Sequence, residues 1–218
     1  MEKPLITSLS NPLVKEARSL RQKKARQESG LFLVEGIHHV GEALAARWSV
    51  DYVLYAPELL TSNFARELVE LLHTGRIGTK SKHVEPQPVS AHVMESLADK
   101  ENPQGLLAVV RQKKAGFSDL QSLKTSVAIV SPQDPGNVGT ILRTMDAVGA
   151  EALFLLDGGV DMYHPTVVRS SMGTLFWKPI VQATFADFAF WVRVKKVQLI
   201  GTSAHADVDY HTLVPQNP

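Results

Sequence analysis

Short apolar runs alternate with amphipathic segments along almost the whole chain, and this alternation restricts the fold more than any other feature of the sequence. Runs rich in aliphatic and β-branched residues predict strands at 31–34, 50–55, 84–88, 105–110, 127–130, 152–156, 179–182 and 197–200. Apolar residues at helical spacing predict helices at 11–27, 37–44, 63–72, 90–99, 138–148, 165–176 and 184–196. Strands that alternate with helices usually pair in parallel, so we expect a layered α/β fold.

Capping signals bound several of the predicted helices. Pro12 suits the first position of the first helix. Ser90 is a suitable N-cap, and Thr184 with Asp187 predicts a capping box. Gly149 is a natural residue for the end of the helix at 138–148. These signals predict where the helices begin and end independently of their apolar faces.

A break in the pattern divides the chain into two parts. The stretch from Arg111 to Lys124 is polar and basic and contains Gly116, which is typical of a linker. After this stretch the strand and helix pattern starts again. The length of 218 residues allows two small domains. We therefore expect one domain at 1–112, a linker at 113–124 and a second domain at 125–218.

Several classes of site are excluded by composition. The chain has no cysteine, so disulfides, zinc–thiolate sites and thiol catalysis are impossible. Its eight histidines show no paired ligand spacing of the zinc type, and we expect no metal. No signal peptide or run of about 20 apolar residues is recognisable. A cytoplasmic location is the expectation.

Basic residues are concentrated near the N-terminus although the net charge is only +1. The cluster comprises Lys15, Arg18, Arg21, Lys23, Lys24 and Arg26, with Glu16 as its single acid. A second cluster contains Arg111, Lys113 and Lys114. Such clusters suit contacts with a phosphate backbone, and the alternative is a solvated helix face.

Three loops are expected at the carboxyl ends of parallel strands, where ligands bind in open α/β sheets. They are residues 131–139, 157–164 and 201–206. The first contains Pro135 and Gly136, which suit a turn with an unusual dihedral angle at the glycine. Asn137 suits a helix N-cap, and Gly139 allows close approach of a ligand or another backbone.

Arg143 adds a positive charge to this strand-to-helix segment. Thr140 and Arg143 are three residues apart and therefore share one face of the predicted helix. Free amides at the helix start, with Arg143 one turn further on, predict an anion site. The alternative is a well-capped turn with an incidental surface arginine.

The order of residues in these segments resembles a known family. The stretch from Asp134 to Gly149 resembles the first signature motif of SpoU/TrmH methyltransferases, which belong to the SPOUT class. The stretch from Val160 to Phe176 resembles the next block of that family. The segments 10–15 and 32–36 resemble its ribosomal-protein-like recognition domain. The resemblance implies an N-terminal α/β/α recognition domain followed by a parallel-sheet α/β SPOUT-type methyltransferase domain.

The resemblance also implies an activity. Such an enzyme transfers a methyl group from S-adenosylmethionine to a ribose 2′-hydroxyl of structured RNA, here rRNA in preference to tRNA, and acts as a homodimer when full-length. Asn137 and Arg143 match catalytic positions around the ribose. A guanidinium keeps its proton near neutral pH, so Arg143 is expected to clamp a phosphate and stabilise the developing alkoxide. Thr202 matches a position at the adenosine pocket. Arg169 and Ser171 lie in a helix that either packs under the site or lines the RNA surface.

The sequence departs from the family pattern at its C-terminal end. The family continues from the segment 201–210 into a further strand, a Gly-x-Glu loop, a Ser-Leu-Asn loop and a closing helix, whereas this sequence stops at 216–218. We therefore expect an incomplete knot, an uncovered sheet edge and weak or no binding of S-adenosylmethionine. Two hypotheses remain: a ribose methyltransferase, or an inactive RNA-binding module left by loss of the cofactor site.

Overall fold

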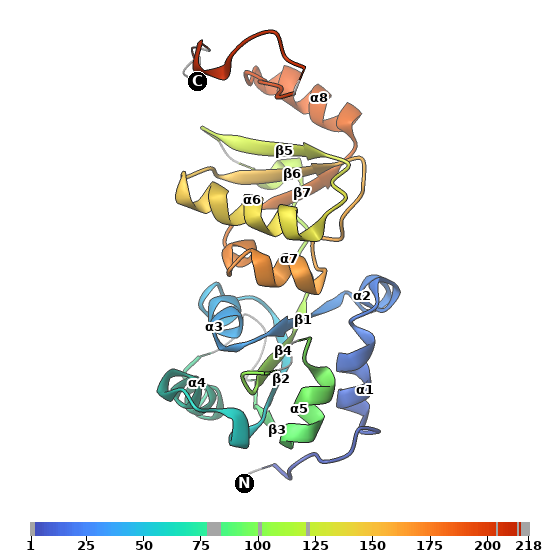
Figure 1. The fold of residues 1–218 in the computed structure, drawn as a ribbon, viewed down its shortest axis with the longest axis vertical. Helices are drawn as coiled ribbons and strands as arrows, with labels where there is room; N and C mark the ends of the chain where they lie inside the picture. The colour runs from blue at the N-terminus through green and yellow to red at the C-terminus, as the bar shows by residue number, and fades with distance from the viewer. Residues whose placement is uncertain are drawn as a thin grey trace.

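The chain folds into two α/β halves stacked end to end, with the termini at opposite ends (Figure 1). The structure, a computed structural model, describes residues 3–77, 84–99, 102–120, 123–203, 205–212 and 214. The final residues, 215–218, lie outside the described residues. Among the described residues, no helix is long and apolar enough to cross a membrane.

The N-terminal half is built on a four-stranded mixed sheet. Its strands are β1 (Leu31–Glu35), β2 (Val50–Tyr55), β3 (Gln87–Pro88) and β4 (Leu106–Arg111), in the order β1-β4-β2-β3. β4 runs antiparallel to both β1 and β2, and only β2 and β3 pair in parallel. The expectation of parallel pairing is therefore wrong for this half. Alternation predicts the order of elements but not the direction in which β4 enters between β1 and β2.

Helices cover both faces of this sheet and complete the α/β/α arrangement. One face carries α1 (Pro12–Ser19) and α5 (Ala91–Leu97), and the other carries α3 (Ile37–Ala45) and α4 (Asn63–His73). Alternate residues of β1 enter the two cores: Leu31 and Leu33 pack with α1 and α5, whereas Phe32 and Val34 face α3 and α4. The period of two is the one expected of a strand buried on both faces.

The predicted helix at 11–27 is two helices, α1 and α2 (Lys23–Ser29). Arg26 causes the difference in part, because its Nη1 donates to the carbonyls of Leu20 (2.8 Å) and Arg21 (2.7 Å) in the connection. These bonds satisfy carbonyl groups that are left free where α1 ends. The capping predictions at Pro12 and Ser90 are confirmed, and the Ser90 side chain accepts from the amide of Val93.

The C-terminal half contains a parallel three-stranded sheet, as the sequence predicts. Its strands β5 (Ser126–Val130), β6 (Ala152–Leu156) and β7 (Ile180–Ala183) lie in the order β5-β6-β7. Helices α6 (Pro135–Ala147) and α7 (Pro165–Ser170) cover one face. α8 (Phe185–Lys195) covers the other, together with the 3-10 turn η2 (Phe117–Asp119). Thr184 caps α8 by accepting from the Asp187 amide at 3.0 Å.

Two further predictions fail in this half. The predicted helix at 165–176 ends at Ser170, because Met172 and Gly173 adopt left-handed backbone conformations (φ 50° and 92°) before the 3-10 turn η3 (Thr174–Phe176). The predicted strand at 197–200 is an exposed coil. A strand forms only where a neighbour supplies backbone partners, and none of the described strands pairs with this segment.

The two halves share one hydrophobic core. Phe32 of β1 lies against Tyr163 of the C-terminal half, with ring centroids 4.5 Å apart. Trp48 packs edge-on against Phe176 at 5.3 Å, and its indole N–H donates to the Phe176 carbonyl at 2.8 Å. The side chains of both halves therefore interlock, with α7 at the junction (Figure 1).

Candidate functional site

The loops after β5 and β6 meet at the carboxyl edge of the parallel sheet. The Val160 amide donates to the Pro132 carbonyl at 3.0 Å, and the Ser131 amide donates to the Leu156 carbonyl at 2.8 Å. Ser131 and Asp157, each the first residue after its strand, have positive φ values of 45° and 55°. Strained backbone of this kind concentrates at functional sites. It has no signature in the residue types, and the sequence did not reveal it.

Helix α6 begins earlier than predicted, and its cap is Asp134. The Asp134 carboxylate accepts from the amides of Gly136 (2.6 Å) and Asn137 (3.3 Å). Asn137 therefore lies inside the first turn, and the prediction that it caps the helix is wrong. Gly136 is helical rather than in an unusual conformation. A carboxylate already occupies the amides that were expected to hold an anion, so the helix start alone is not an anion site.

The outer face of α6 presents the two predicted catalytic side chains to solvent. Asn137, Thr140 and Arg143 are all exposed. Thr140 donates its hydroxyl to the Gly136 carbonyl, which leaves the amide of Asn137 and the guanidinium of Arg143 as the outward polar groups. Arg143 forms no ion pair with any described residue. An exposed cation and an exposed amide on one helix are groups that suit contacts with a phosphodiester or a ribose.

Gly139 sets the distance between α6 and α7. A Cβ atom at this position would lie 1.9 Å from the Ser170 hydroxyl oxygen and 2.8 Å from the Val167 carbonyl oxygen. The prediction that Gly139 permits close approach is confirmed, and the approaching group is the backbone of α7. This contact places α7, which carries Arg169, directly behind the exposed face of α6.

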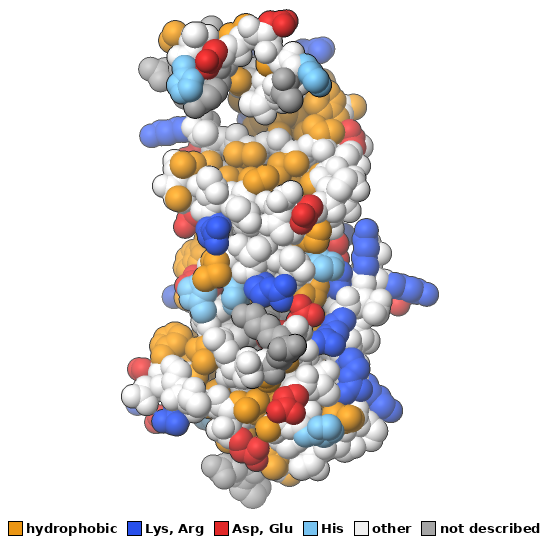
Figure 2. All heavy atoms as spheres, in the orientation of Figure 1, with side chains coloured by type: hydrophobic (Ala, Val, Ile, Leu, Met, Phe, Trp, Pro, Cys, Tyr) orange, Lys and Arg blue, Asp and Glu red, His pale blue; other side chains and the backbone are white. Residues whose placement is uncertain are grey.

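The predicted basic cluster divides into three classes in the structure. Lys15, Lys23 and Lys24 are exposed on α1 and α2, where Lys and Arg side chains gather along one edge of the N-terminal half (Figure 2). Arg18 and Arg21 are half-buried and donate to Ser96 and to the end of α5. Arg26 is 1% exposed, so it cannot contact RNA.

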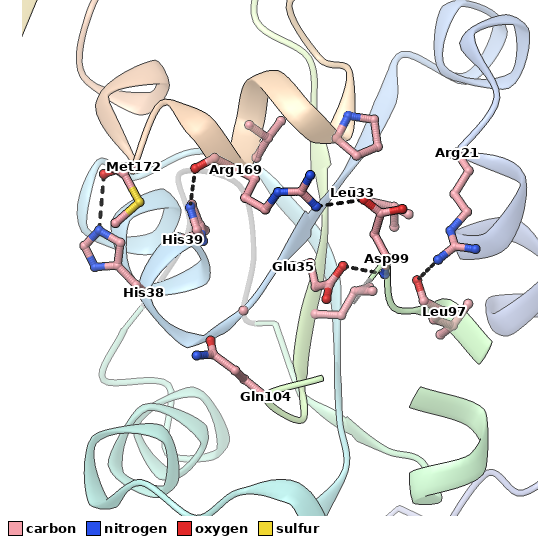
Figure 3. Close-up of a pocket in the computed structure, with 14 residues that line it drawn as sticks. Arg21, Leu33, Glu35, His38, His39, Leu97, Asp99, Gln104, Arg169 and Met172 are labelled. Carbon is pink, nitrogen blue, oxygen red and sulfur yellow. Dashed lines mark hydrogen bonds and ion pairs between the residues drawn. The ribbon is translucent and has the colours of Figure 1, made fainter. Parts of the chain in front are cut away.

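A cavity of about 220 Å³ lies between the two halves, with Arg21 and Arg169 among its lining residues. The structure thus brings together two predicted RNA contacts that are far apart in sequence. Figure 3 shows Arg169 donating to Asp99 at 2.8 Å and His39 bonded to the Arg169 carbonyl at 3.1 Å. The polar groups that line the cavity therefore largely bond to one another across the two halves. Ser171, by contrast, is buried and donates to the Val168 carbonyl, so it faces no ligand.

The loop at 157–164 contains two important residues that sequence reasoning did not assign to the site. Asp161 accepts two bonds from Arg26 of α2, at 2.7 and 2.9 Å. The Tyr163 hydroxyl donates to the Lys113 carbonyl at 2.6 Å and accepts from the Lys113 amide at 2.8 Å. Burial raises the pKa of Tyr163 to about 12, so its hydroxyl stays neutral and can donate. Only the three-dimensional structure identifies these partners.

Thr202 lies in an exposed coil after α8, flanked by exposed Gly201 and Ser203. An exposed coil offers no enclosing apolar wall, whereas cofactor sites are concave and bury most of their ligand. The residues described around Thr202 therefore do not by themselves fit S-adenosylmethionine. Among the described residues, neither the cavity between the halves nor the one beside Trp177 is lined by Thr202, Asn137 or Arg143.

Comparison with known proteins places both halves in described families. The MRM3-like substrate binding domain matches residues 11–108, and the SpoU rRNA Methylase family matches residues 124–217. A 23S rRNA (guanosine(2553)-2′-O)-methyltransferase of Bacillus subtilis is 29% identical over 97% of this chain and 78% of its own length. A 23S rRNA (uridine(2479)-2′-O)-methyltransferase of Streptomyces viridochromogenes is 29% identical over 87% of this chain, which spans 66% of that relative.

Solved structures agree with these matches. The AdoMet-bound rRNA methyltransferase from Sinorhizobium meliloti superposes with a TM-score of 0.83 and 32% identity, covering 99% of this chain and 78% of that one. A likeness of this extent includes both halves and their relative placement. The exposed Asn137 and Arg143 thus lie on α6, the helix after the first strand of the C-terminal half, in a fold shared with a solved rRNA methyltransferase. The chain belongs to the SpoU rRNA methylase family.

Proposed function

We propose that this protein transfers a methyl group from S-adenosylmethionine to a ribose 2′-hydroxyl of rRNA. The observation that carries the proposal is the exposed pair Asn137 and Arg143 on α6, beside the strained carboxyl ends of β5 and β6. The family match supports the reaction class, and the relatives named above are rRNA 2′-O-methyltransferases. The same relatives favour rRNA over tRNA as the substrate.

In this proposal Arg143 acts on the RNA through its charge. The guanidinium remains protonated at neutral pH and can bond two phosphate oxygens at once. Held beside the reacting ribose, it also stabilises the negative charge that develops on the 2′-oxygen as the hydroxyl gives up its proton to solvent water. Asn137 donates or accepts a hydrogen bond at the same ribose and fixes its orientation.

S-adenosylmethionine is proposed as the methyl donor because solved relatives contain it. Thr202 is retained as a candidate residue at the edge of the adenosine pocket. The exposed coil around Thr202 does not enclose a ligand, so the contact of Thr202 with the cofactor rests on the family resemblance alone. The proposed roles of Asn137 and Arg143 concern the RNA and do not depend on that contact.

The N-terminal half is proposed to bind the RNA, with the recognition domain at 1–112, the linker at 113–124 and the methyltransferase domain at 125–218. The exposed lysines of α1 and α2 supply phosphate contacts (Figure 2). Arg18, Arg21 and Arg169 have side chains held by protein partners, and they are proposed to contribute charge near the junction. We further propose that the protein forms a homodimer and is located in the cytoplasm.

Mapping of ribose methylation in cells tests the function directly. We expect deletion of the gene to remove one 2′-O-methyl group from large-subunit rRNA, detected as new sensitivity to alkaline cleavage at a single nucleotide. Re-expression of the complete gene product should restore the modification. Binding of rRNA without any lost methylation would favour the inactive RNA-binding module, and loss of a tRNA methyl group would overturn the choice of substrate.

Replacing Lys15, Lys23 and Lys24 together with methionine should weaken RNA binding uniformly across sequences. Three lost phosphate contacts lower the slope of log K against log salt concentration by about 2. The measurement is a salt titration of binding to an rRNA fragment. Arg66, Arg76 and Lys195 are exposed cations elsewhere, and their joint replacement is the charge-matched control. Equal slopes in the two triple variants would contradict the assigned surface.

A further inference from the structure

Arg26 forms a buried ion pair between the two halves. Its side chain is 2% exposed, and its Nη2 and Nε donate to one carboxylate oxygen of Asp161 at 2.7 and 2.9 Å. Asp161 is 14% exposed and uses its other oxygen to accept from the Tyr163 amide at 2.9 Å. The guanidinium also donates to two carbonyls of the α1–α2 connection. Nearly every polar atom of the pair is therefore engaged.

Asp161 belongs to the loop after β6, which meets the loop after β5 at the carboxyl edge of the parallel sheet. The residue before it, Val160, donates its amide to the Pro132 carbonyl. Gly159 also packs closely against the Pro132 carbonyl oxygen, because a Cβ atom at Gly159 would lie 2.2 Å from that oxygen. Pro132 is two residues before Asp134, the cap of α6. A short chain of contacts thus runs from Arg26 to the helix that carries Asn137 and Arg143.

A buried ion pair is a costly way to join two domains. Desolvation of the two charges offsets much of their attraction, and an apolar pair of similar size often stabilises a fold as well or better. The best-attested use of such a pair is to specify one arrangement of the elements it joins. The aromatic contacts at the junction already supply apolar stabilisation. The ion pair of Arg26 and Asp161 adds to this junction a contact that depends on direction as well as distance.

We propose that Arg26 and Asp161 are positioning residues, which hold the 157–164 loop, and through it the start of α6, in the geometry that methyl transfer needs. The inference rests on the function proposed above. It makes the recognition half part of the active-site framework, because the same helix that presents Lys23 and Lys24 to RNA carries Arg26. Neither residue touches the RNA or the reacting atoms.

The test removes both charges together, so that neither is left buried alone. In the double variant Arg26→Met with Asp161→Asn, the asparagine oxygen can still accept from the Tyr163 amide. The control is Lys3→Met with Glu85→Gln, which removes a partly exposed ion pair within the N-terminal half, with an N–O distance of 3.2 Å. Thermal unfolding of each double variant verifies that the fold is retained.

The first readout is hydrogen exchange at the Val160 amide, measured by NMR on this chain without substrate. We expect exchange to accelerate about tenfold or more in the Arg26/Asp161 variant, with the Leu155 amide of β6 unchanged and no change at either amide in the control. Unchanged exchange at Val160 would overturn the proposal. So would equal acceleration at Leu155, which would indicate general loosening of the domain.

The second readout is methyl transfer by the complete gene product. We expect kcat to fall by about 10- to 100-fold while KM for RNA stays within about twofold, because the exposed lysines remain. A fall in affinity with unchanged kcat would make Arg26 a binding determinant and overturn the proposal. If the parent protein transfers no methyl group, the proposed function fails, and the exchange result alone still decides whether the pair holds the loop.

Discussion

Replacing Arg143 with alanine is expected to lower methyl transfer by about a thousandfold, to the limit of detection in most assays. The charge of Arg143 is proposed to hold the RNA phosphate and to stabilise the developing 2′-alkoxide. No other described side chain on the exposed face of α6 carries a positive charge. Arg143→Lys keeps the charge without the planar fork, so it should retain only part of the activity.

The variant should be otherwise normal, because Arg143 is exposed and forms no ion pair with the residues that the structure describes. Alanine is also a good helix former, so α6 is expected to remain intact. Single-turnover transfer to an rRNA fragment measures the effect, with thermal unfolding and S-adenosylmethionine titration as companions. Arg193→Ala on α8, another exposed arginine, is the control and should remain active. An active Arg143→Ala enzyme would refute the assignment.

Local sequence signals predicted those parts of the fold that depend on neighbouring residues alone. Ser90 and Thr184 cap the helices they were expected to cap, and Gly149 follows α6 with a positive φ of 75°. Signals of this kind act within one turn of helix, so a single sequence contains them completely. The limits of β2 and β6 also match the prediction, and the apolar run of β6 is bounded by Glu151 and Asp157.

Several failures involve partners that are distant in sequence, although the misplaced cap of α6 is local, since Asp134 rather than Asn137 caps that helix. The break between α1 and α2 depends on Arg26, whose other partner Asp161 lies 135 residues away. The direction of β4 depends on which strands flank it, and the coil at 197–200 lacks a neighbouring strand. Apolar periodicity reports that a segment is suited to pairing, but it cannot identify the partner.

The sequence likewise predicts only some features of the candidate site. Family resemblance predicts catalytic roles for Asn137 and Arg143, which stay predictions, and the structure shows that both side chains are exposed on α6. Charge alone grouped Arg26 with the lysines, although burial removes it from the surface. An arginine and a lysine look alike in a basic cluster, whereas only arginine offers a fork that satisfies a buried carboxylate and two carbonyls together. The Arg26–Asp161 pair was therefore visible only in three dimensions.

Gly139→Ala should destabilise the protein although it places a better helix former inside α6. In an unstrained helix this exchange stabilises by about 0.5–1 kcal/mol. Here the new Cβ meets the Val167 carbonyl oxygen at 2.8 Å, and a backbone atom cannot rotate away as the Ser170 hydroxyl can. α7 must move away from α6, and Val167 and Val168 are buried in the core between the halves. Overpacking of this kind costs about 1–3 kcal/mol.

Thermal unfolding would show the effect as a Tm lower by about 3–10 °C. Gly41→Ala in α3 is the matched control, since the nearest atom to its Cβ is Phe64 Cζ at 3.4 Å, and that variant should be neutral or more stable. Combining Gly139→Ala with Ser170→Ala should recover only part of the loss, because the contact with the Val167 carbonyl remains. The shift of α6 should also lower methyl transfer, by displacing Asn137 and Arg143. A Gly139→Ala protein as stable as the parent would show that the two helices can separate without cost.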